Sequence, residues 1–164
     1  MRKGFIDDRS AHRVYAAAAA LGDTVLASSG DFGVSGYGDT SPVAWYPASD
    51  PLVTAVGGTE GMPYPDGLQN AAGGYGGEEA WNESAIGGGA TGGAPSQLFP
   101  SPPYQSGVSG NSKRTVPDVS YNASSFAGVV VILGGRHAVI GGTSAGPPQW
   151  AGIIALADQA RASA

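Results

Sequence analysis

Residues 11–31 read AHRVYAAAAALGDTVLASSGD and contain the transition that decides the fold. The five consecutive alanines favour a helix over residues 11–21, because alanine has the highest intrinsic helix propensity. Gly22 is placed to end this helix. The apolar residues 24–28 that follow predict a short buried strand. A helix, a tight connection and an apolar strand in succession are typical of an α/β fold.

The remaining segments extend this pattern toward the C-terminus. Residues 52–56 predict a second strand that closes on glycines, and residues 57–110 are rich in Gly, Pro, Ser and Asn with few periodic signals. Two apolar segments, 128–133 and 137–140, flank a Gly-Gly-Arg sequence and predict a β-hairpin. Residues 145–160 predict a final helix, which we expect to be buried because its N-terminal half is apolar on most faces.

Composition indicates one globular domain over residues 1–164. The chain is 41% hydrophobic and only 13% charged, with 28 glycines, 12 prolines and no cysteine, which excludes disulfides and thiolate metal sites. A formal charge of −5 argues against a nucleic-acid partner. No apolar segment is long enough to span a bilayer, so no membrane partner is expected. We expect residues 1–10 to be flexible and to lack a secretion signal, since charged residues interrupt any apolar core there.

The segment 141–148 reads GGTSAGPP and precedes the apolar start of the last predicted helix. A serine held between glycines and a helix start, here Ser144, is one way in which hydrolases present a nucleophilic hydroxyl. The unpaired N–H groups and positive dipole of the helix start favour a developing negative charge. An ordinary capped helix start has the same short pattern, so both interpretations remain open for this segment alone.

Taken together, several segments resemble the sedolisin family, the serine-carboxyl peptidases with a subtilisin-like fold. The likeness runs from Gly22 to Gln159. The resemblance implies an α/β protein with a mainly parallel central sheet, a partial form of the three-layer subtilisin-like fold. The segments that carry it, in the order of the family, are Ala27–Asp31, Tyr46–Pro51, Val53–Thr59, Trp81-Asn82, Gly92-Gly93, Phe99 with Pro103–Gln105, Arg114–Ser120 and Gly142–Ala145 with Pro148 and Trp150–Ile153.

The resemblance implies a catalytic role for two residues of this chain. Ser144 would attack the scissile peptide carbonyl and form an acyl-enzyme. Asp31 would lie in the oxyanion hole, where a carboxyl group can donate a hydrogen bond only when it is protonated. That requirement suits an enzyme that works in acid. The alternative for Asp31 is a structural Asx turn at the end of a strand.

Three other titratable residues are expected to lie outside the catalytic chemistry. Asp118, in a Val-Pro-Asp-Val sequence, is expected to accept backbone N–H bonds near the sheet. His137 lies on the predicted hairpin seven residues before Ser144, a poor geometry for a conventional Ser-His pair. His12, on the alanine-rich helix, is expected to face solvent.

The chain also departs from the family pattern. Family members carry a glutamate base and an aspartate four residues apart on a helix upstream of the Ser-Ser-Gly-Asp segment, together with further N-terminal strands, and this sequence has no matching stretch. Glu79 and Glu83 have the right spacing but flank a different family segment, and Asp7 and Asp8 do not fit either.

The C-terminal part departs from the family as well. The family calcium loop has no counterpart before Ala164, so no metal or cofactor is predicted. Gly146 replaces a serine that is usual two residues after the nucleophile, which loosens the first helical turn by up to ~1 kcal/mol.

The sequence therefore predicts a fragment of an acid-acting serine endopeptidase that acts on polypeptides and is weak or inactive alone. The alternative is a non-catalytic module that pairs its open sheet edge with a separate N-terminal half. The family is typically extracellular or lysosomal, and the sequence does not decide the localisation.

Overall fold

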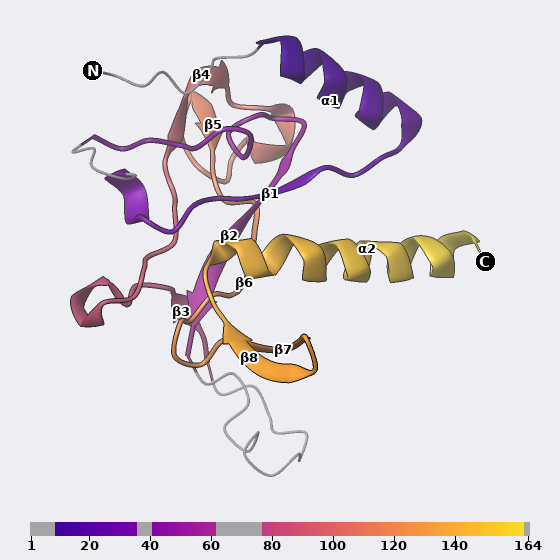
Figure 1. Cartoon of the computed structure of the whole chain (residues 1–164). Coiled ribbons are helices and arrows are strands. Elements are labelled where there is room, and N and C mark those ends of the chain that lie inside the picture. The colour runs from indigo at the N-terminus through magenta and orange to yellow at the C-terminus, as the bar shows by residue number, and fades with distance from the viewer. Residues whose placement is uncertain (1–8, 36–40, 62–76, 163–164) are drawn as a thin grey trace.

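The computed structural model describes residues 9–35, 41–61 and 77–162, and it places a small mixed sheet at the centre of the molecule (Figure 1). Of the described elements, the two α-helices lie near the start and the end of the chain. The elements in chain order are α1 (Arg9–Leu21), β1 (Leu26–Ser28), η1 (Gly33–Ser35), β2 (Thr54–Glu60), β3 (Glu79–Ala80), η3 (Ser84–Ile86), β4 (Pro95–Pro100), η4 (Pro103–Gln105), β5 (Lys113–Thr115), β6 (Val119–Asn122), β7 (Val129–Leu133), β8 (Arg136–Ile140), η5 (Thr143–Ala145) and α2 (Gly146–Ala162).

Strand β2 is the central strand of the sheet. It pairs in parallel with β1 along one edge and with β6 along the other, and Val56 faces Ser28 and Val119 at once. The short β3 pairs antiparallel with the end of β2. It lies along the same edge of β2 as β1, beyond the residues that pair with β1. The expected α/β architecture with a mainly parallel sheet is therefore confirmed.

The predicted end of the second strand was wrong. β2 does not close at its glycines but continues through Gly57 and Gly58 to Glu60. A Cβ at Gly57 would lie 2.6 Å from the Pro117 ring, and one at Gly58 would lie 2.6 Å from the Cβ of Ala123. Glycine in this strand therefore permits close packing on its two sides rather than a turn.

Several strands were missed by the sequence analysis. β3, β4 and β5 all lie where it expected loops or made no prediction, and β4 and β5 form a separate antiparallel pair. β4 begins and ends with proline and its register is irregular, so it carries no alternating signal. These pairings depend on distant partners, which local sequence patterns do not report.

Helix α1 was predicted correctly and begins at Arg9, so the last two residues of the segment expected to be flexible are helical. The other eight, with Asp7 and Asp8 among them, lie outside the described residues. The prediction that His12 faces solvent was wrong. Its Nδ1 atom lies 2.9 Å from a carboxylate oxygen of the fully buried Asp50, and its ring packs 5.3 Å from that of Phe99. This contact fastens α1 to the loop before β2.

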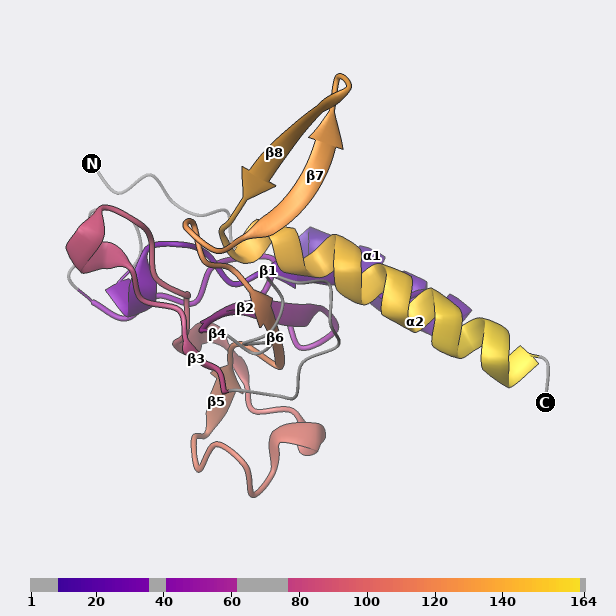
Figure 2. The same cartoon turned by 90° about the horizontal axis from the view of Figure 1, so that it is seen from below.

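The predicted hairpin is present as β7 and β8, joined by Gly134 and Gly135, whose positive φ angles of 57° and 76° suit a tight two-residue turn. The hairpin projects away from the sheet (Figure 2). Val130, Ile132 and Leu133 are each more than 60% exposed.

The last helix was predicted in the right place but is not buried. Only its first turn packs closely on the sheet, where a Cβ at Gly146 would lie 2.5 Å from Cγ1 of Val56. The Trp150 indole donates a hydrogen bond to the Ser120 carbonyl. Beyond this turn the helix extends past the sheet (Figure 1), and Leu156 is 67% exposed. The apolar composition therefore predicted the helix correctly but did not predict its exposure to solvent.

Candidate functional site

Asp31 and Thr143, which are 112 residues apart, are joined by a compact set of hydrogen bonds that we call the Asp31–Thr143 clasp. Oδ1 of Asp31 accepts from the Thr143 amide at 2.7 Å and from the Thr143 hydroxyl at 2.6 Å. The same hydroxyl accepts the Gly30 amide at 3.1 Å. Asp31 follows β1, so the clasp places it at the carboxyl end of the sheet beside the residue before Ser144.

The other oxygen of Asp31 lies over Gly142. A Cβ at Gly142 would stand 2.7 Å from Oδ2, and the residue has a φ of 85°, which L side chains rarely adopt. Glycine is therefore needed here for both reasons. No hydrogen bond to Oδ2 is found among the described residues, which leaves this oxygen accessible to a further group.

Ser144 lies in η5, directly before α2, and is exposed to solvent. Within the described ranges, neither its hydroxyl nor its amide makes a hydrogen bond. Its amide belongs to the first turn of a helical segment, where N–H groups have no helical acceptor. The Ser144 hydroxyl and amide thus come one residue after Thr143, to which the Asp31 carboxyl is hydrogen-bonded.

A shallow pocket of about 480 Å³ adjoins this site. Asp31, Gly142, Trp81 and Ser125 are among the residues that line it. Gly142 also donates its amide to the Ala123 carbonyl at 2.8 Å, immediately after β6. The carboxyl ends of parallel strands are the usual place for ligands in open α/β sheets.

The two glutamates with base-like spacing lie away from Ser144. Glu79 is exposed on β3, opposite Glu60. Glu83 is only 6% exposed and accepts hydrogen bonds from Ser124 and Ser125. In the described part of the chain, neither one contacts Ser144.

His137 is exposed on β8 and shares the register position of Ile132. No contact between His137 and Ser144 is found in the described part of the chain. The geometry therefore gives no support to a conventional Ser-His pair.

Asp118 has the structural role that its sequence predicted. It accepts the Ala55 amide at 2.8 Å and forms a two-pronged ion pair with the fully buried Arg114, with both N–O distances at 2.5 Å. The guanidinium also donates to the Val53 carbonyl and lies 5.8 Å from the centre of the Tyr104 ring. Burial raises the pKa of Tyr104, and Arg114 opposes that rise.

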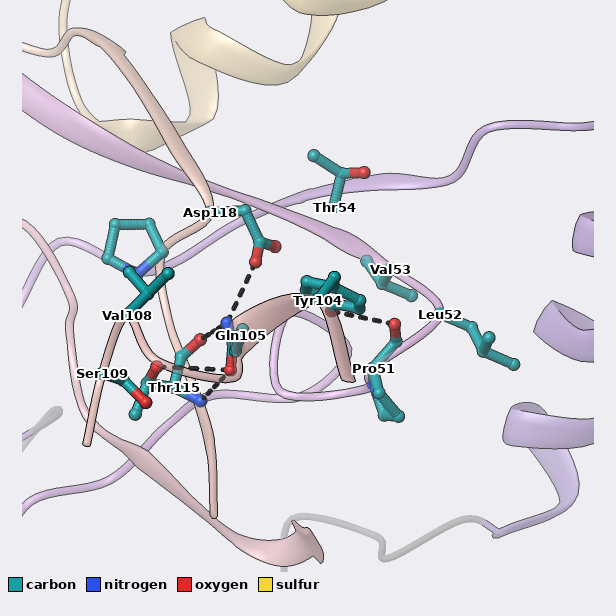
Figure 3. Close-up of a pocket in the computed structure, with 11 residues that line it drawn as sticks. Pro51, Leu52, Val53, Thr54, Tyr104, Gln105, Val108, Ser109, Thr115 and Asp118 are labelled. Carbon is teal, nitrogen blue, oxygen red and sulfur yellow. Dashed lines mark hydrogen bonds between the residues drawn. The ribbon is translucent and has the colours of Figure 1, made fainter. Parts of the chain in front are cut away.

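A second pocket, of about 470 Å³, lies beside Asp118 (Figure 3). It adjoins the amino ends of β2 and β6, so it is at the opposite end of the sheet from the clasp. Gln105 donates to Asp118 and to the Thr115 carbonyl, and it accepts the Thr115 amide. The Tyr104 hydroxyl donates to the Pro51 carbonyl. Because these polar groups bind one another, we assign them to structure.

The described residues include no cluster of three or more His, Cys, Asp or Glu side chains that could hold a metal ion. They also include no helix that is both long and apolar enough to cross a membrane.

Known proteins resemble the chain over most of its length. It is 39% identical over 157 residues to kumamolisin from Bacillus sp. strain MN-32, covering 90% of this chain and 27% of that protein. It is 40% identical over 162 residues to sedolisin from Pseudomonas sp. strain 101, covering 92% of this chain and 26% of that protein. The chain thus spans about a quarter of the length of these relatives. No family model matches it.

A solved structure gives the same result in three dimensions. Pseudomonas sedolisin, described as a serine-carboxyl proteinase complexed with two molecules of pseudo-iodotyrostatin, superposes with a TM-score of 0.78 at 38% sequence identity. The match covers 93% of this chain and 43% of that one.

Proposed function

Over the region that it shares with these relatives, the chain belongs to the sedolisin family, and we propose that it forms part of the catalytic domain of an acid-acting serine endopeptidase. Its fold is accordingly part of the subtilisin-like α/β fold. The observation that supports the activity is the Asp31–Thr143 clasp, which brings a carboxyl group beside an exposed, unbonded serine.

In this proposal Ser144 Oγ attacks the carbonyl carbon of a peptide bond while its proton passes to a base. The carbonyl oxygen becomes an oxyanion, which accepts hydrogen bonds from the Ser144 amide and from Oδ2 of a protonated Asp31. The clasp fixes Oδ1 as an acceptor, so the proton of the carboxylic acid resides on Oδ2, the oxygen with no other partner. The base then returns the proton to the leaving nitrogen, so the C–N bond breaks, the amine departs and an acyl-enzyme remains, which water then hydrolyses.

The base is the missing part of this arrangement. Among the described residues no carboxylate or imidazole accepts the Ser144 proton, and Glu79, Glu83 and His137 all lie elsewhere. Loss of a nucleophile–base pair lowers kcat by several orders of magnitude. We therefore propose that this stretch of chain has little activity unless another segment supplies the base.

The test is a chimera in which this chain replaces the matching region of Pseudomonas sedolisin. We expect the chimera to digest denatured protein in acidic buffer, while the chain alone digests little. Ser144→Ala should abolish the activity, and Asp31→Ala should reduce it. His137→Ala serves as the control and should change nothing. A folded chimera that stays inactive, or that keeps its activity after Ser144→Ala, would overturn the proposal.

A second candidate is a non-catalytic complementation module. Exposed apolar side chains on the hairpin and on α2, among them Ile132, Leu133 and Leu156, favour it, because such surface is available for burial against a partner. The test mixes this chain with the separately produced remainder of the sedolisin catalytic domain. Co-elution in size-exclusion chromatography without any proteolysis would favour this candidate. A chain that elutes alone in every mixture would contradict it.

A further inference from the structure

Glu83 is a buried carboxylate for which the proposed mechanism has no use. Its side chain is 6% exposed, and its two oxygens accept hydrogen bonds from the Ser124 hydroxyl at 2.5 Å and from the Ser125 amide at 2.8 Å. Burial of an acidic group is costly unless hydrogen bonds offset it. The two hydrogen bonds offset this cost, and both donors belong to one short segment of the chain.

The segment that it holds is the turn 123–127, which follows β6. The Ser124 hydroxyl donates to Glu83 and accepts the amides of Phe126 and Ala127, at 3.2 and 2.8 Å. The Asn122 side chain donates to the Ala127 carbonyl. The turn therefore closes around one hydroxyl, and Glu83 is the acceptor that orients it.

The turn 123–127 also contacts the backbone segment that leads to Ser144. The Ala123 carbonyl accepts the Gly142 amide at 2.8 Å. A Cβ at Gly141 would lie 2.5 Å from the Ser124 carbonyl oxygen and 2.8 Å from Cα of Ser125. The two backbones are thus in direct contact, and a movement of the turn displaces Gly141 and Gly142.

We propose that Glu83 is a positioning residue for the nucleophile segment: it fixes the turn 123–127, which sets the backbone of Gly141 and Gly142 beneath Asp31. One face of Gly142 meets Asp31 Oδ2, and its amide is held by the turn. The segment is thus contacted both by Asp31 and by the turn that Glu83 holds. The catalytic consequence rests on the function proposed above, whereas the positioning does not.

Two variants remove this support to different degrees. In Glu83→Gln the side-chain amide cannot accept from Ser124 and Ser125 at once, so one donor is left without an acceptor. Ser124→Ala removes the hydroxyl and is a smaller change, which keeps the test valid if Glu83→Gln fails to fold. Glu79→Gln is the matched control, because it removes the same charge from an exposed site on neighbouring β3.

The first measurement is hydrogen exchange of the backbone amides in the chain without substrate. We expect Glu83→Gln and Ser124→Ala to speed exchange at Gly142 and Ala127 by about tenfold or more, with little change in α1 or between β1 and β2. Ser124→Thr, which keeps the hydroxyl, should restore slow exchange, and Glu79→Gln should resemble the parent. Unchanged exchange at Gly142, or equal acceleration everywhere, would overturn the proposal.

The second measurement uses the chimera with Pseudomonas sedolisin. Since Glu83 touches the nucleophile segment only through the turn, we expect Glu83→Gln to lower kcat about tenfold or more with a smaller change in KM. Equal loss in Glu79→Gln would contradict this role. A parent chimera without activity refutes the proposed function alone, because the exchange at Gly142 still decides whether Glu83 positions the segment.

Discussion

At the scale of single residues, Gly146 allows the first turn of α2 to pack closely against β2. A Cβ there would lie 2.5 Å from the stiff, fully buried Val56 side chain, whereas one at Gly152 would meet nothing within 4 Å. We predict that Gly146→Ala destabilises the chain by ~1–3 kcal/mol through overpacking. Gly152→Ala, its control in the same helix, should stabilise by ~0.5–1 kcal/mol. Urea denaturation of both variants measures the difference, and equal shifts would contradict the packing explanation.

Glu83 gives a pH-dependent prediction at the same scale. Burial raises the pKa of its carboxyl, but hydrogen bonds from Ser124 and Ser125 outweigh burial and leave the pKa below its ordinary value. A pKa that is lower in the folded state contributes stability above the unfolded pKa, and this contribution is lost as the pH falls through the folded pKa. The free energy of unfolding of Glu83→Gln should therefore be lower at neutral pH and approach that of the parent in acid. Urea titrations across this range, with Glu79→Gln as control, test it.

The sequence indicated some of these residues and missed others. Ser144 could be singled out because it stands in a glycine-rich segment before a helix start, and Asp31 could be named because its segment resembles one of the sedolisin family. Glu83 could be seen only as a misplaced base, since its partner Ser124 is 41 residues away and no local pattern connects them. The buried Arg114 was part of a recognised segment, but its pairing with Asp118 at i, i+4 was not predicted.

At the scale of elements, the contact between His12 and the buried Asp50 joins helix α1 to the loop before β2. Among the described residues, the carboxylate of the buried Asp50 has two partners, the His12 ring and the Leu52 amide. We predict that His12→Ala costs ~1–3 kcal/mol, because it leaves a buried carboxylate with one donor fewer. Arg13→Ala, at the next and exposed position, should cost little. Thermal unfolding compares the two, and equal effects would show that His12 does not anchor the helix.

The elements that the sequence predicted are those whose signal is local. Alanine propensity indicated α1, and a Gly-Gly pair between apolar segments indicated the hairpin. β3 and β4 carry no such signal, since they form only where a distant strand offers an edge. The burial of α2 was wrongly predicted, because an apolar composition does not show which other elements pack against a helix.

At the scale of the whole molecule, the hairpin presents apolar surface to solvent. Val130 and Val139 face each other across its strands, and Ile132 is 72% exposed. We predict that Ile132→Lys reduces self-association at high concentration with little loss of stability. Ser112→Lys adds the same charge at an exposed site away from the hairpin and should have a smaller effect. Light scattering as a function of concentration distinguishes them, and equal effects would assign the change to net charge.

The Asp31–Thr143 clasp also has a consequence for the order of folding. It joins residues 112 positions apart, so the entropy of closing that long loop must be overcome before the contact can form. The β7–β8 hairpin, which closes across two glycines, can form within microseconds. Contacts of high sequence separation are characteristic of slow folding steps. We therefore expect the segment that carries Ser144 to become ordered after the hairpin, since its position depends on this long-range contact.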